Sequence, residues 1–289
     1  MKKILVTGAG GYVGSVLIPM LLKNNFKVIA YDRFFFGLDK LKTNKNLEII
    51  KGDTRQFDKK ILYSTYGVID LAAISNDPSS EFLKKETSQI NFKARFNLAK
   101  LSKKQNVKKY ILPSSCSVYG LSNSIASELS PTNPQSIYAK ANLDCENSIL
   151  PLSNEKFCVT ILRQPTLYGY SPRMRFDLAV NGMTYGAWND FKLPLLRDGN
   201  QFRPILHVKD TCDFMIFILK YRKTIDINKQ IFNVGSETCN YKLLKLAKVV
   251  KKINENILNK KISIKWYGDK DNRSYRVDFT KIGSKLNWK

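Results

Sequence analysis

The sequence predicts an α/β protein: a doubly wound parallel sheet with a smaller C-terminal lobe. Short runs of β-branched residues alternate with segments of helical periodicity through the first half of the chain, and this rhythm breaks after about residue 164. Such alternation is typical of βαβ units, in which helices connect neighbouring parallel strands. With 289 residues, 43% of them apolar, the chain can bury the core that such a sheet needs.

The expected strands are short and almost wholly apolar. Parallel strands take this form because helices cover both faces of their sheet. We expect strands at residues 3–7, 27–31, 47–51, 67–71, 109–113 and 158–163. Helical periodicity fills the intervals, most clearly at residues 12–25 and 90–106.

The second lobe is expected where the alternation stops. Prolines and arginines cluster there, as in YGYSPRMRFD (168–177), and strands become sparse. We therefore divide the chain into residues 1–163 and a smaller lobe of residues 164–289 that closes over the sheet. The chain is expected to return to the first unit near residues 205–235.

Composition excludes several classes of protein. No apolar run reaches the roughly 18 residues of a spanning helix, so no membrane insertion is expected. The start, MKKILVTGAGG, is interpreted as a first strand and not a signal peptide. Five cysteines without a CxxC pair favour a reducing cytoplasm. One histidine, His207, argues against a histidine-built metal site, and no metal is expected.

The net charge of +24 is compatible with nucleic acid, an acidic membrane surface or small anionic substrates as partners. No recognised nucleic-acid module accompanies the charge. In KLLKLAKVVKKI (242–253) the apolar residues are expected to keep to one helix face. We therefore interpret the lysines as a solvated surface and expect no nucleic acid.

A glycine-rich turn follows the first expected strand. Gly8, Gly11 and Gly14 fall between that strand and the helix after it, where glycines allow a tight turn, close approach to a pyrophosphate and close helix–strand packing. Asp32 ends the next strand, where a carboxylate binds the adenosine ribose hydroxyls and repels a 2′-phosphate. Arg33 is the counter-argument, because a basic residue there would accept that phosphate. We expect NAD as the cofactor.

The glycine spacing and later motifs resemble the extended short-chain dehydrogenases/reductases of the nucleotide-sugar epimerase and dehydratase type, which have a Rossmann fold. The shared motifs are TGAGGYVG (7–14), GD (52–53), DLAA (70–73), SSCSVYG (114–120), Tyr138, RPILHVKD (203–210) and FNVG (232–235). The resemblance places a further set of residues along the cofactor cleft or behind it: Tyr12, Val13, Asp53, Thr54, Leu71, Ala72, Ala73, Asn91 and Pro165. It also suggests that relatives continue beyond KLNWK (285–289) into one more helix.

The resemblance implies a catalytic tyrosine and serine. In the family a tyrosinate removes the proton from a sugar hydroxyl while a serine or threonine hydrogen-bonds the same hydroxyl. Tyr138 and Ser115 match these positions, and Ser117 would be a second hydroxyl nearby.

The chain departs from the family at Asn142, four residues after Tyr138, where a lysine is expected. Tyrosine ionises near pH 10, so a base working near neutral pH needs a neighbouring cation. Lys140 cannot serve, since two residues turn a helix by about 200°. Asn142 can bond the nicotinamide ribose but brings no charge, so we expect a lysine restored there to speed turnover. The alternative is a silent protein that binds NAD and nucleotide-sugar without catalysis.

The resemblance also narrows the reaction. Dehydratases of the family place an Asp-Glu pair after the catalytic hydroxyl residue, whereas this chain has Cys116 and Ser117, and we interpret Cys116 as buried packing. Hydride chemistry at C4 of a nucleoside-diphosphate sugar remains, by a 4-epimerase or a 4-dehydrogenase. The segment SPRMRFDLAVNGM (171–183) resembles enzymes of bacterial capsule and surface-polysaccharide (lipopolysaccharide) sugar pathways, including GDP-heptose 4-dehydrogenases.

Candidate substrate contacts follow from the same resemblance. They are Ser75, Asn76, Arg173, Arg175, Asn181, Arg203 and Arg273. Arginines suit a diphosphate because the guanidinium is a planar two-pronged donor, although Arg173 and Arg175 fit a solvated loop equally well. His207 is interpreted as a structural residue at the junction of the lobes. A homodimer is expected through the helices at residues 87–105 and 138–150, which carry Ile90, Phe92, Leu98, Leu101, Leu143 and Ile149.

Overall fold

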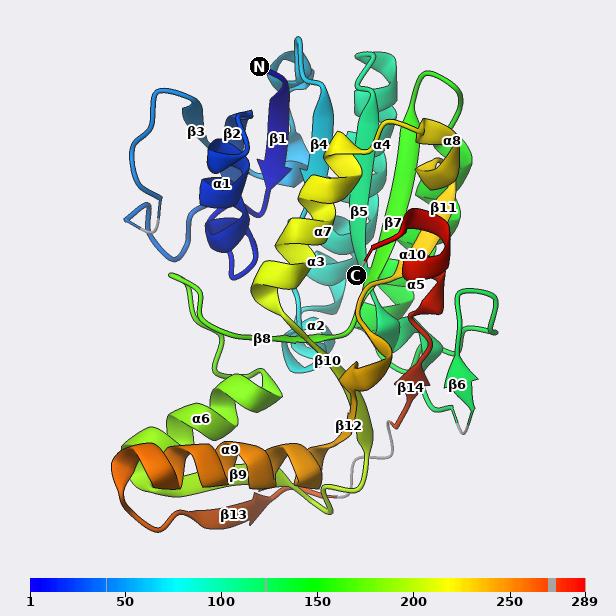
Figure 1. Ribbon diagram of the computed structural model, residues 1–289. Coiled ribbons are helices and arrows are strands. Elements are labelled where there is room, and N and C mark those ends of the chain that lie inside the picture. Colours follow the sequence, from blue (N-terminus) through cyan, green and yellow to red (C-terminus); the bar gives the residue numbers. More distant parts are fainter. Residues whose placement is uncertain (40, 123, 270–273, 289) are drawn as a thin grey trace.

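Seven parallel strands form the central sheet of the larger lobe, in the order β11-β7-β5-β4-β1-β2-β3 (Figure 1). The computed structural model describes residues 1–39, 41–122, 124–269 and 274–288. The strands are β1 (Lys3–Thr7), β2 (Lys27–Asp32), β3 (Leu47–Lys51), β4 (Gly67–Asp70), β5 (Lys109–Ser115), β7 (Cys158–Gln164) and β11 (Gln230–Asn233). The doubly wound α/β fold is confirmed, and every expected strand lies within two residues of an observed one.

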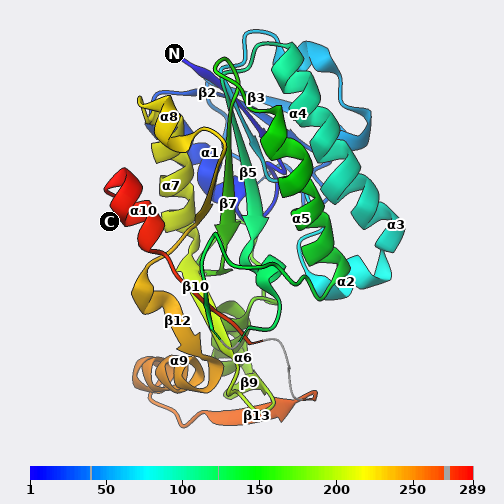
Figure 2. The ribbon, with the colours of Figure 1, turned by 90° about the vertical axis from the view of Figure 1, so that its right-hand side faces the viewer.

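Helices cover both faces of this sheet (Figure 2). On one face lie α1 (Gly14–Lys23), α7 (Val208–Lys220), α8 (Thr224–Ile227) and α10 (Thr280–Leu286). On the other lie α2 (Asp77–Phe82), α3 (Lys84–Thr87), α4 (Arg95–Lys104) and α5 (Ile137–Ile149). A π-helical segment, Ser88–Ala94, leads directly into α4.

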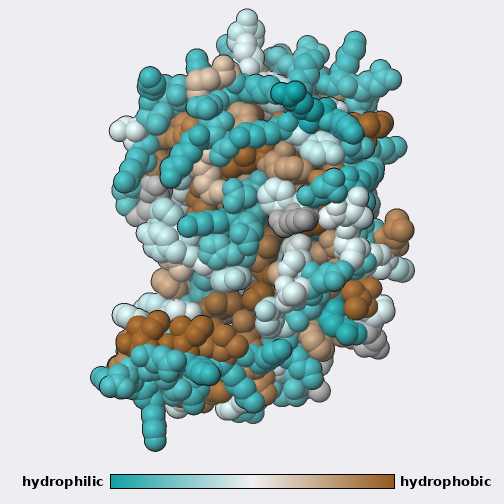
Figure 3. All heavy atoms as spheres, viewed as in Figure 1, coloured by the Kyte–Doolittle hydropathy of each residue, from teal (hydrophilic) through white to brown (hydrophobic). Residues whose placement is uncertain are grey.

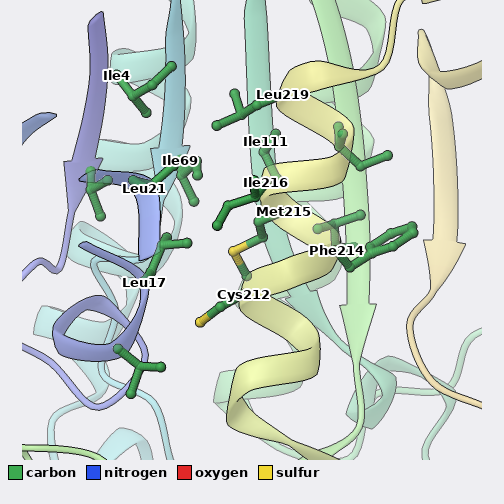
Figure 4. Close-up of a cluster of buried hydrophobic side chains, with 14 of the residues drawn as sticks. Ile4, Leu17, Leu21, Ile69, Ile111, Cys212, Phe214, Met215, Ile216 and Leu219 are labelled. Carbon is green, nitrogen blue, oxygen red and sulfur yellow. The ribbon is translucent and has the colours of Figure 1, made fainter. Parts of the chain in front are cut away.

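The first face is sealed by α1 and α7. Figure 4 shows Leu17 and Leu21 of α1, and Met215 of α7, directed toward Ile69 and Ile111 of the sheet. All five side chains are fully buried. Apolar burial of this extent is the main term that holds the two helices on the sheet.

The second face is sealed by α4 and α5. Leu98 of α4 and Ile149 of α5 are 1% and 0% exposed, within one cluster that also holds Leu5 and Val68 of the sheet. The sequence predicts both side chains at a dimer surface, yet the core of one subunit already buries them. Residues that are partly buried, such as Phe92 and Leu101, remain available for contact with a second subunit.

The smaller lobe has its own core. It contains α6 (Ala179–Asp190), α9 (Leu243–Leu258) and a parallel pair, β9 (Lys192–Leu196) and β13 (Ser263–Tyr267). Met183, Leu193, Leu246 and Ile262 are buried between them. A three-stranded sheet connects the lobes: β12 (Asn240–Lys242), β10 (Phe202–His207) and β8 (Thr166–Tyr168). The remaining pair is β6 (Ile125–Ala126) with β14 (Arg276–Val277).

The chain crosses between the lobes more than once. After the smaller lobe begins, α7 packs against α1 and β11 pairs with β7. Ile282 and Leu286 of α10 join the core cluster of the first sheet face. Part of the segment 164–289 therefore belongs to the larger lobe, and its last helix lies far from α6 and α9 (Figure 1).

The surface in view is mostly hydrophilic over the larger lobe, while apolar side chains gather over the region of α6 and α9 (Figure 3). On α9 the lysines 245, 248 and 252 are exposed, as expected. However, Val249, Ile253 and Ile257 are 46%, 52% and 64% exposed, so the smaller lobe covers only part of the apolar side of α9. No helix among the described residues is long and apolar enough to cross a membrane.

Candidate active site

The glycine turn lies against the carboxyl end of β4. Gly8 has a φ of +66°, and a Cβ there would lie 2.7 Å from the carbonyl carbon of Leu71 and 2.8 Å from the nitrogen of Ala72. A Cβ on Gly14 would collide with the carbonyl oxygens of Gly8 and Ala9. Only glycine fits at both places. Gly11 differs, since its Cβ would meet only the Gly8 oxygen, at 3.1 Å, so its other side is open.

Asp32 is fixed beside this turn. Its Oδ2 accepts a hydrogen bond from the Gly10 amide at 3.1 Å, and its Oδ1 accepts one from the Phe34 amide at 2.7 Å. The carboxylate thus lies at the end of β2 next to the turn, where it can face an adenosine ribose. Arg33 turns away to Asp53, with Nη1 at 3.3 Å from Oδ2. The Arg33 guanidinium, which could have accepted the 2′-phosphate of NADP, is therefore paired with a carboxylate.

Asp53 also binds Arg55, whose Nη2 donates to Asp53 Oδ2 at 2.5 Å. The hydrogen bonds from Arg55 lower the pKa of the Asp53 carboxyl to about 2, although partial burial opposes this. Asp53 is thus held as an ion between two arginines, next to the buried Thr54. That Asp53 and Thr54 lie at the adenine stays a prediction.

The loop after β4 forms the other wall of the cleft. Leu71, Ala72 and Ala73 are partly buried there, and the Ala72 amide donates to Thr7 Oγ1 at 3.2 Å. Asn91 is fully buried and pairs with the backbone of Ile74 through both amide atoms, each at 2.8 Å. Asn91 therefore positions this loop through both atoms of its side-chain amide. Pro165 follows directly after β7.

Tyr12 joins the turn to the smaller lobe. Its hydroxyl donates to the Gly169 carbonyl at 2.7 Å, and burial raises the pKa of this tyrosine. Asn181 accepts from the Gly169 amide at 2.9 Å and donates to the Tyr12 hydroxyl at 3.3 Å. The Asn181 amide is thus occupied within the junction, which was not expected for a residue facing substrate phosphates. Val13 lies at the start of α1, where its carbonyl accepts from the Cys212 thiol at 3.9 Å.

Ser115 and Tyr138 lie at the same edge of the sheet as the glycine turn. Ser115 is the last residue of β5, and its Oγ accepts from the Ser117 amide at 3.1 Å. Ser117 Oγ is buried without a hydrogen-bond partner among the described residues. Tyr138 is half-buried in the first turn of α5, a helix capped by Ser136, whose Oγ accepts from the Ala139 amide.

Asn142 lies one turn behind Tyr138 and is 1% exposed. Its Nδ2 donates to the Tyr138 carbonyl at 3.0 Å, and its Oδ1 accepts from Arg95 Nη1 at 3.2 Å. Lys140 is exposed, as the helix geometry predicted. The contact with Arg95 was not anticipated, because a basic residue in an amphipathic segment is normally solvated.

The loop around residues 171–177 bridges the cleft. Arg175 donates to Ser75 Oγ at 3.0 Å and to Asp177 Oδ2 at 2.6 Å, and Asn76 donates to the same Asp177 oxygen at 3.1 Å. The Arg173 guanidinium lies over the Phe36 ring, 3.7 Å from its centre. Three of the expected substrate contacts, Ser75, Asn76 and Arg175, therefore lie together. Both arginines are only partly exposed.

The other candidates are placed as follows. Arg203 lies on β10, and its Nη1 donates to the Phe202 carbonyl at 2.9 Å. Arg273 lies outside the described residues. Cys116 is buried, which raises the pKa of its thiol well above the usual range, so it is no base. His207 caps α7 by accepting from the Lys209 amide at 3.3 Å, which agrees with a structural role at the lobe junction.

Among the described residues no cluster of histidine, cysteine or carboxylate side chains could hold a metal ion. The residues fit NAD instead: a glycine turn with one open side at Gly11, a fixed carboxylate at Asp32 and a helix N-terminus behind them. A helix N-terminus favours the negative charge of a pyrophosphate.

The chain is similar to known proteins. Residues 4–235 match the family model described as "NAD dependent epimerase/dehydratase family". An uncharacterized UDP-glucose epimerase of Bacillus subtilis (strain 168) is 31% identical over 72% of this chain and 69% of its own length. UDP-glucuronic acid decarboxylase 1 of Arabidopsis thaliana is 24% identical over 99% of this chain and 66% of its own.

Among solved structures, the UDP-glucuronic acid 4-epimerase of Bacillus cereus, in complex with UDP-glucuronic acid and NAD, matches with a TM-score of 0.87. It is 26% identical, and the match covers 99% of this chain and 93% of that one. The chain therefore belongs to the NAD-dependent epimerase/dehydratase family of extended short-chain dehydrogenases/reductases, with NAD as its cofactor.

Proposed function

We propose that this protein is an NAD-dependent oxidoreductase that acts at C4 of a nucleoside-diphosphate sugar, as a 4-epimerase or a 4-dehydrogenase. The observation that supports the proposal is the buried thiol of Cys116, directly after Ser115 at the end of β5, where Ser115 Oγ accepts a hydrogen bond from the Ser117 amide. Ser115 and Tyr138, at the start of α5, are the proposed pair of reacting hydroxyl groups. Elimination of water across C5 and C6 needs an acid and a base at the positions of Cys116 and Ser117, and neither residue supplies them.

The chemistry at the sugar is a proton transfer guided by two hydroxyl groups. Tyr138 takes the proton from the sugar hydroxyl, and Ser115 holds the oxygen of that hydroxyl in position. Ser117 Oγ, which is buried and has no hydrogen-bond partner among the described residues, is a second hydroxyl group near the site. NAD, when bound, supplies the oxidising equivalent.

Substrate binding is assigned to the arginine-rich loop and to Arg203 and Arg273. Arg175 is held by Asp177 in the free protein, and a diphosphate would compete with that carboxylate for the same guanidinium. We therefore expect Arg175 to exchange Asp177 for phosphate oxygens when substrate binds. The resemblance of residues 171–183 to surface-polysaccharide enzymes supports a place in bacterial capsule or lipopolysaccharide sugar synthesis.

The second candidate function is a silent sensor of NAD and nucleotide-sugar. Asn142 favours it, because the family lysine is absent. The two proposals agree on ligands and differ only in turnover.

The test begins with thermal unfolding in the presence of NAD and each of UDP, GDP, dTDP and CDP. A ligand at 100 times its dissociation constant adds about 2.7 kcal/mol of stability. Sugars linked to the stabilising nucleotide are then assayed for NADH formation, which reports net oxidation, and for the C4 epimer. Tyr138→Phe should bind both ligands and lose turnover. If no nucleoside diphosphate stabilises the protein, both candidate functions are contradicted. If the parent protein binds a nucleoside diphosphate but turns over none of the sugars, the sensor function is supported and the oxidoreductase is contradicted.

A homodimer remains part of the proposal. The π-helical segment Ser88–Ala94 and α4 supply Phe92, Phe96 and Leu101, which are only partly buried in one subunit. Light scattering should give about twice the 33.1 kDa subunit mass, and a mass at the subunit value contradicts the dimer.

A further inference from the structure

A buried cation lies directly behind the active-site helix. Arg95, the first residue of α4, is 2% exposed. Its Nη2 donates to the carbonyl oxygens of Asp70 and Pro113, at 2.9 Å and 2.7 Å. Its Nη1 donates to Asn142 Oδ1 at 3.2 Å. One edge of the guanidinium therefore faces the ends of β4 and β5, and the other faces α5.

The contact with α5 continues to the backbone of Tyr138. Asn142 accepts from Arg95 with its oxygen and donates with its nitrogen to the Tyr138 carbonyl, at 3.0 Å. The family lysine would extend from this same position. A charged group thus contacts the side chain that occupies the position of the family lysine, but this charged group comes from a different helix.

An arginine suits this place better than a lysine. Its planar fork donates in several fixed directions at once, and here it reaches two strands and one helix. The π-helical segment Ser88–Ala94 ends immediately before Arg95. Such segments change the register of a helix locally and are frequent at functional sites.

We propose that Arg95, through Asn142, supplies the positive charge that stabilises the tyrosinate form of Tyr138, in place of the missing lysine. The inference rests on the proposed function, which makes Tyr138 the base. Arg95 touches neither sugar nor cofactor in this scheme, so it is a positioning residue that acts through the field at Tyr138.

The charges around Arg95 support this assignment. Burial acts to lower the pKa of Arg95, but Asp70, Cys145, Tyr110 and Tyr138 all act to raise it, and the pKa lies above its usual value. Tyr138 is thus among the groups with which Arg95 interacts electrostatically.

Negative groups near the site limit the effect. Asp70 Oδ2 lies 3.7 Å from Arg95 Nε, on the edge away from α5, and accepts a hydrogen bond from Tyr110. At the other end of the site, Asp77 and Glu81 of α2 bind the N-terminus of α5. An opposite charge close to a titrating group shifts its titration by about one to three pH units. With Asp70 present we expect the lower end of that range.

This arrangement changes the expectation for position 142. The sequence suggested that Asn142→Lys would speed turnover. In the structure the new ammonium would lie against the buried guanidinium of Arg95, and two like charges at hydrogen-bonding distance repel each other. Asn142→Lys alone should therefore reduce stability and give no gain in turnover.

The test is the alkaline titration of Tyr138 itself, read as tyrosinate absorbance of each variant minus that of its Tyr138→Phe counterpart. This subtraction isolates one signal from the 14 tyrosines, and it needs no substrate. Arg95→Met should move the midpoint upward by about one pH unit, a tenfold change. The double variant Arg95→Met/Asn142→Lys, which moves the cation to α5, should move it back.

Asp70→Asn provides the opposite perturbation, because it removes the negative charge beside Arg95, while the hydroxyl groups that bind Asp70 can still bind the new side-chain amide. The titration midpoint of Tyr138 should fall in this variant. Lys140→Ala, on the exposed side of α5, is the matched control and should leave the midpoint unchanged. If Arg95→Met does not fold, Asp70→Asn still decides. A folded Arg95→Met or Asp70→Asn variant with the parent midpoint overturns the inference.

Activity separates this inference from the proposed function. Where a nucleotide-sugar is turned over, the pH–rate profile should follow the tyrosinate midpoint in every variant. If the titration midpoint shifts in the variants but the protein turns over no nucleotide-sugar, the role of Arg95 is supported and the proposed oxidoreductase function is contradicted. If the protein is active but its pH–rate profile is the same with and without Arg95, only the role of Arg95 is contradicted.

Discussion

Two glycines of the cofactor turn should respond to alanine in opposite ways. Gly8 has a left-handed φ of +66°, and a Cβ there would lie 2.7–2.8 Å from backbone atoms of Leu71 and Ala72. A left-handed backbone costs an L-residue roughly 1–2 kcal/mol, and overpacking against backbone costs about 1–3 kcal/mol more. Gly8→Ala should therefore lose about 2–5 kcal/mol of folding stability.

Gly11→Ala is the matched comparison. Its Cβ would meet only one atom, the Gly8 oxygen at 3.1 Å, so the free protein should lose about 1 kcal/mol or less. The added methyl would instead lie on the open side of the turn, where the pyrophosphate approaches. This variant should fold and fail to bind NAD.

Thermal unfolding with and without NAD measures both effects. For a chain of this size each kcal/mol corresponds to about 2–4 °C, so Gly8→Ala should lower Tm by roughly 4–20 °C without any ligand. Gly11→Ala should stay near the parent Tm but lose the rise that NAD gives. The reasoning is refuted if Gly11→Ala is stabilised by NAD as strongly as the parent, or if Gly8→Ala unfolds at the parent temperature.

Three other changes test the surroundings of the site. Glu146→Ala should lower the free energy of unfolding by about 3–5 kcal/mol, because it leaves the Arg163 guanidinium, now bound at 2.6 Å, buried without its counter-charge. In urea unfolding Glu146→Gln should lose less stability than Glu146→Ala, and equal losses would contradict a charge effect. Asp53→Asn should be less stable than the parent above about pH 4, and the difference in stability should shrink as the pH falls toward 2. The reason is that Arg55 holds the pKa of Asp53 at about 2, so the ionised carboxylate of the parent loses its stabilising effect in that range. A stability difference that does not change with pH would contradict this. Asn181→Ala should cost about 1–3 kcal/mol by leaving the Gly169 amide unpaired, and an unchanged Tm would show that the junction is not held this way.

The larger lobe was predictable because its strands carry their own signal. Parallel strands buried on both faces are continuous apolar runs, and β1, β2 and β7 begin at the expected residues for this reason. The smaller lobe gives no such signal. Its strands, such as β8 and β12, have three residues each, too few for periodicity to separate them from loops.

The site was predictable where glycines and motif positions define it, and unpredictable where tertiary contacts do. The helix geometry correctly placed Asn142 behind Tyr138 and Lys140 in solvent. Arg95 could not be found from sequence, because its burial depends on acceptors from β4 and β5 far away along the chain. The hydrogen bond that Asn181 makes across the lobe junction could not be found from sequence for the same reason, since its partner is a tyrosine 169 residues before it.

The return of the chain to the sheet has a consequence for its biosynthesis. The edge strand β11 begins at residue 230, and Ile282 and Leu286 enter the same core as Leu17 and Ile69. A nascent chain that has left the ribosome only up to residue 163 thus holds an open strand edge at β7 and an uncovered sheet face where α7 will pack. Exposed edges and apolar faces recruit other chains, so this intermediate is the form most prone to aggregate and most in need of a chaperone. Ribosome-stalled chains of increasing length should become resistant to protease only after α10 has emerged.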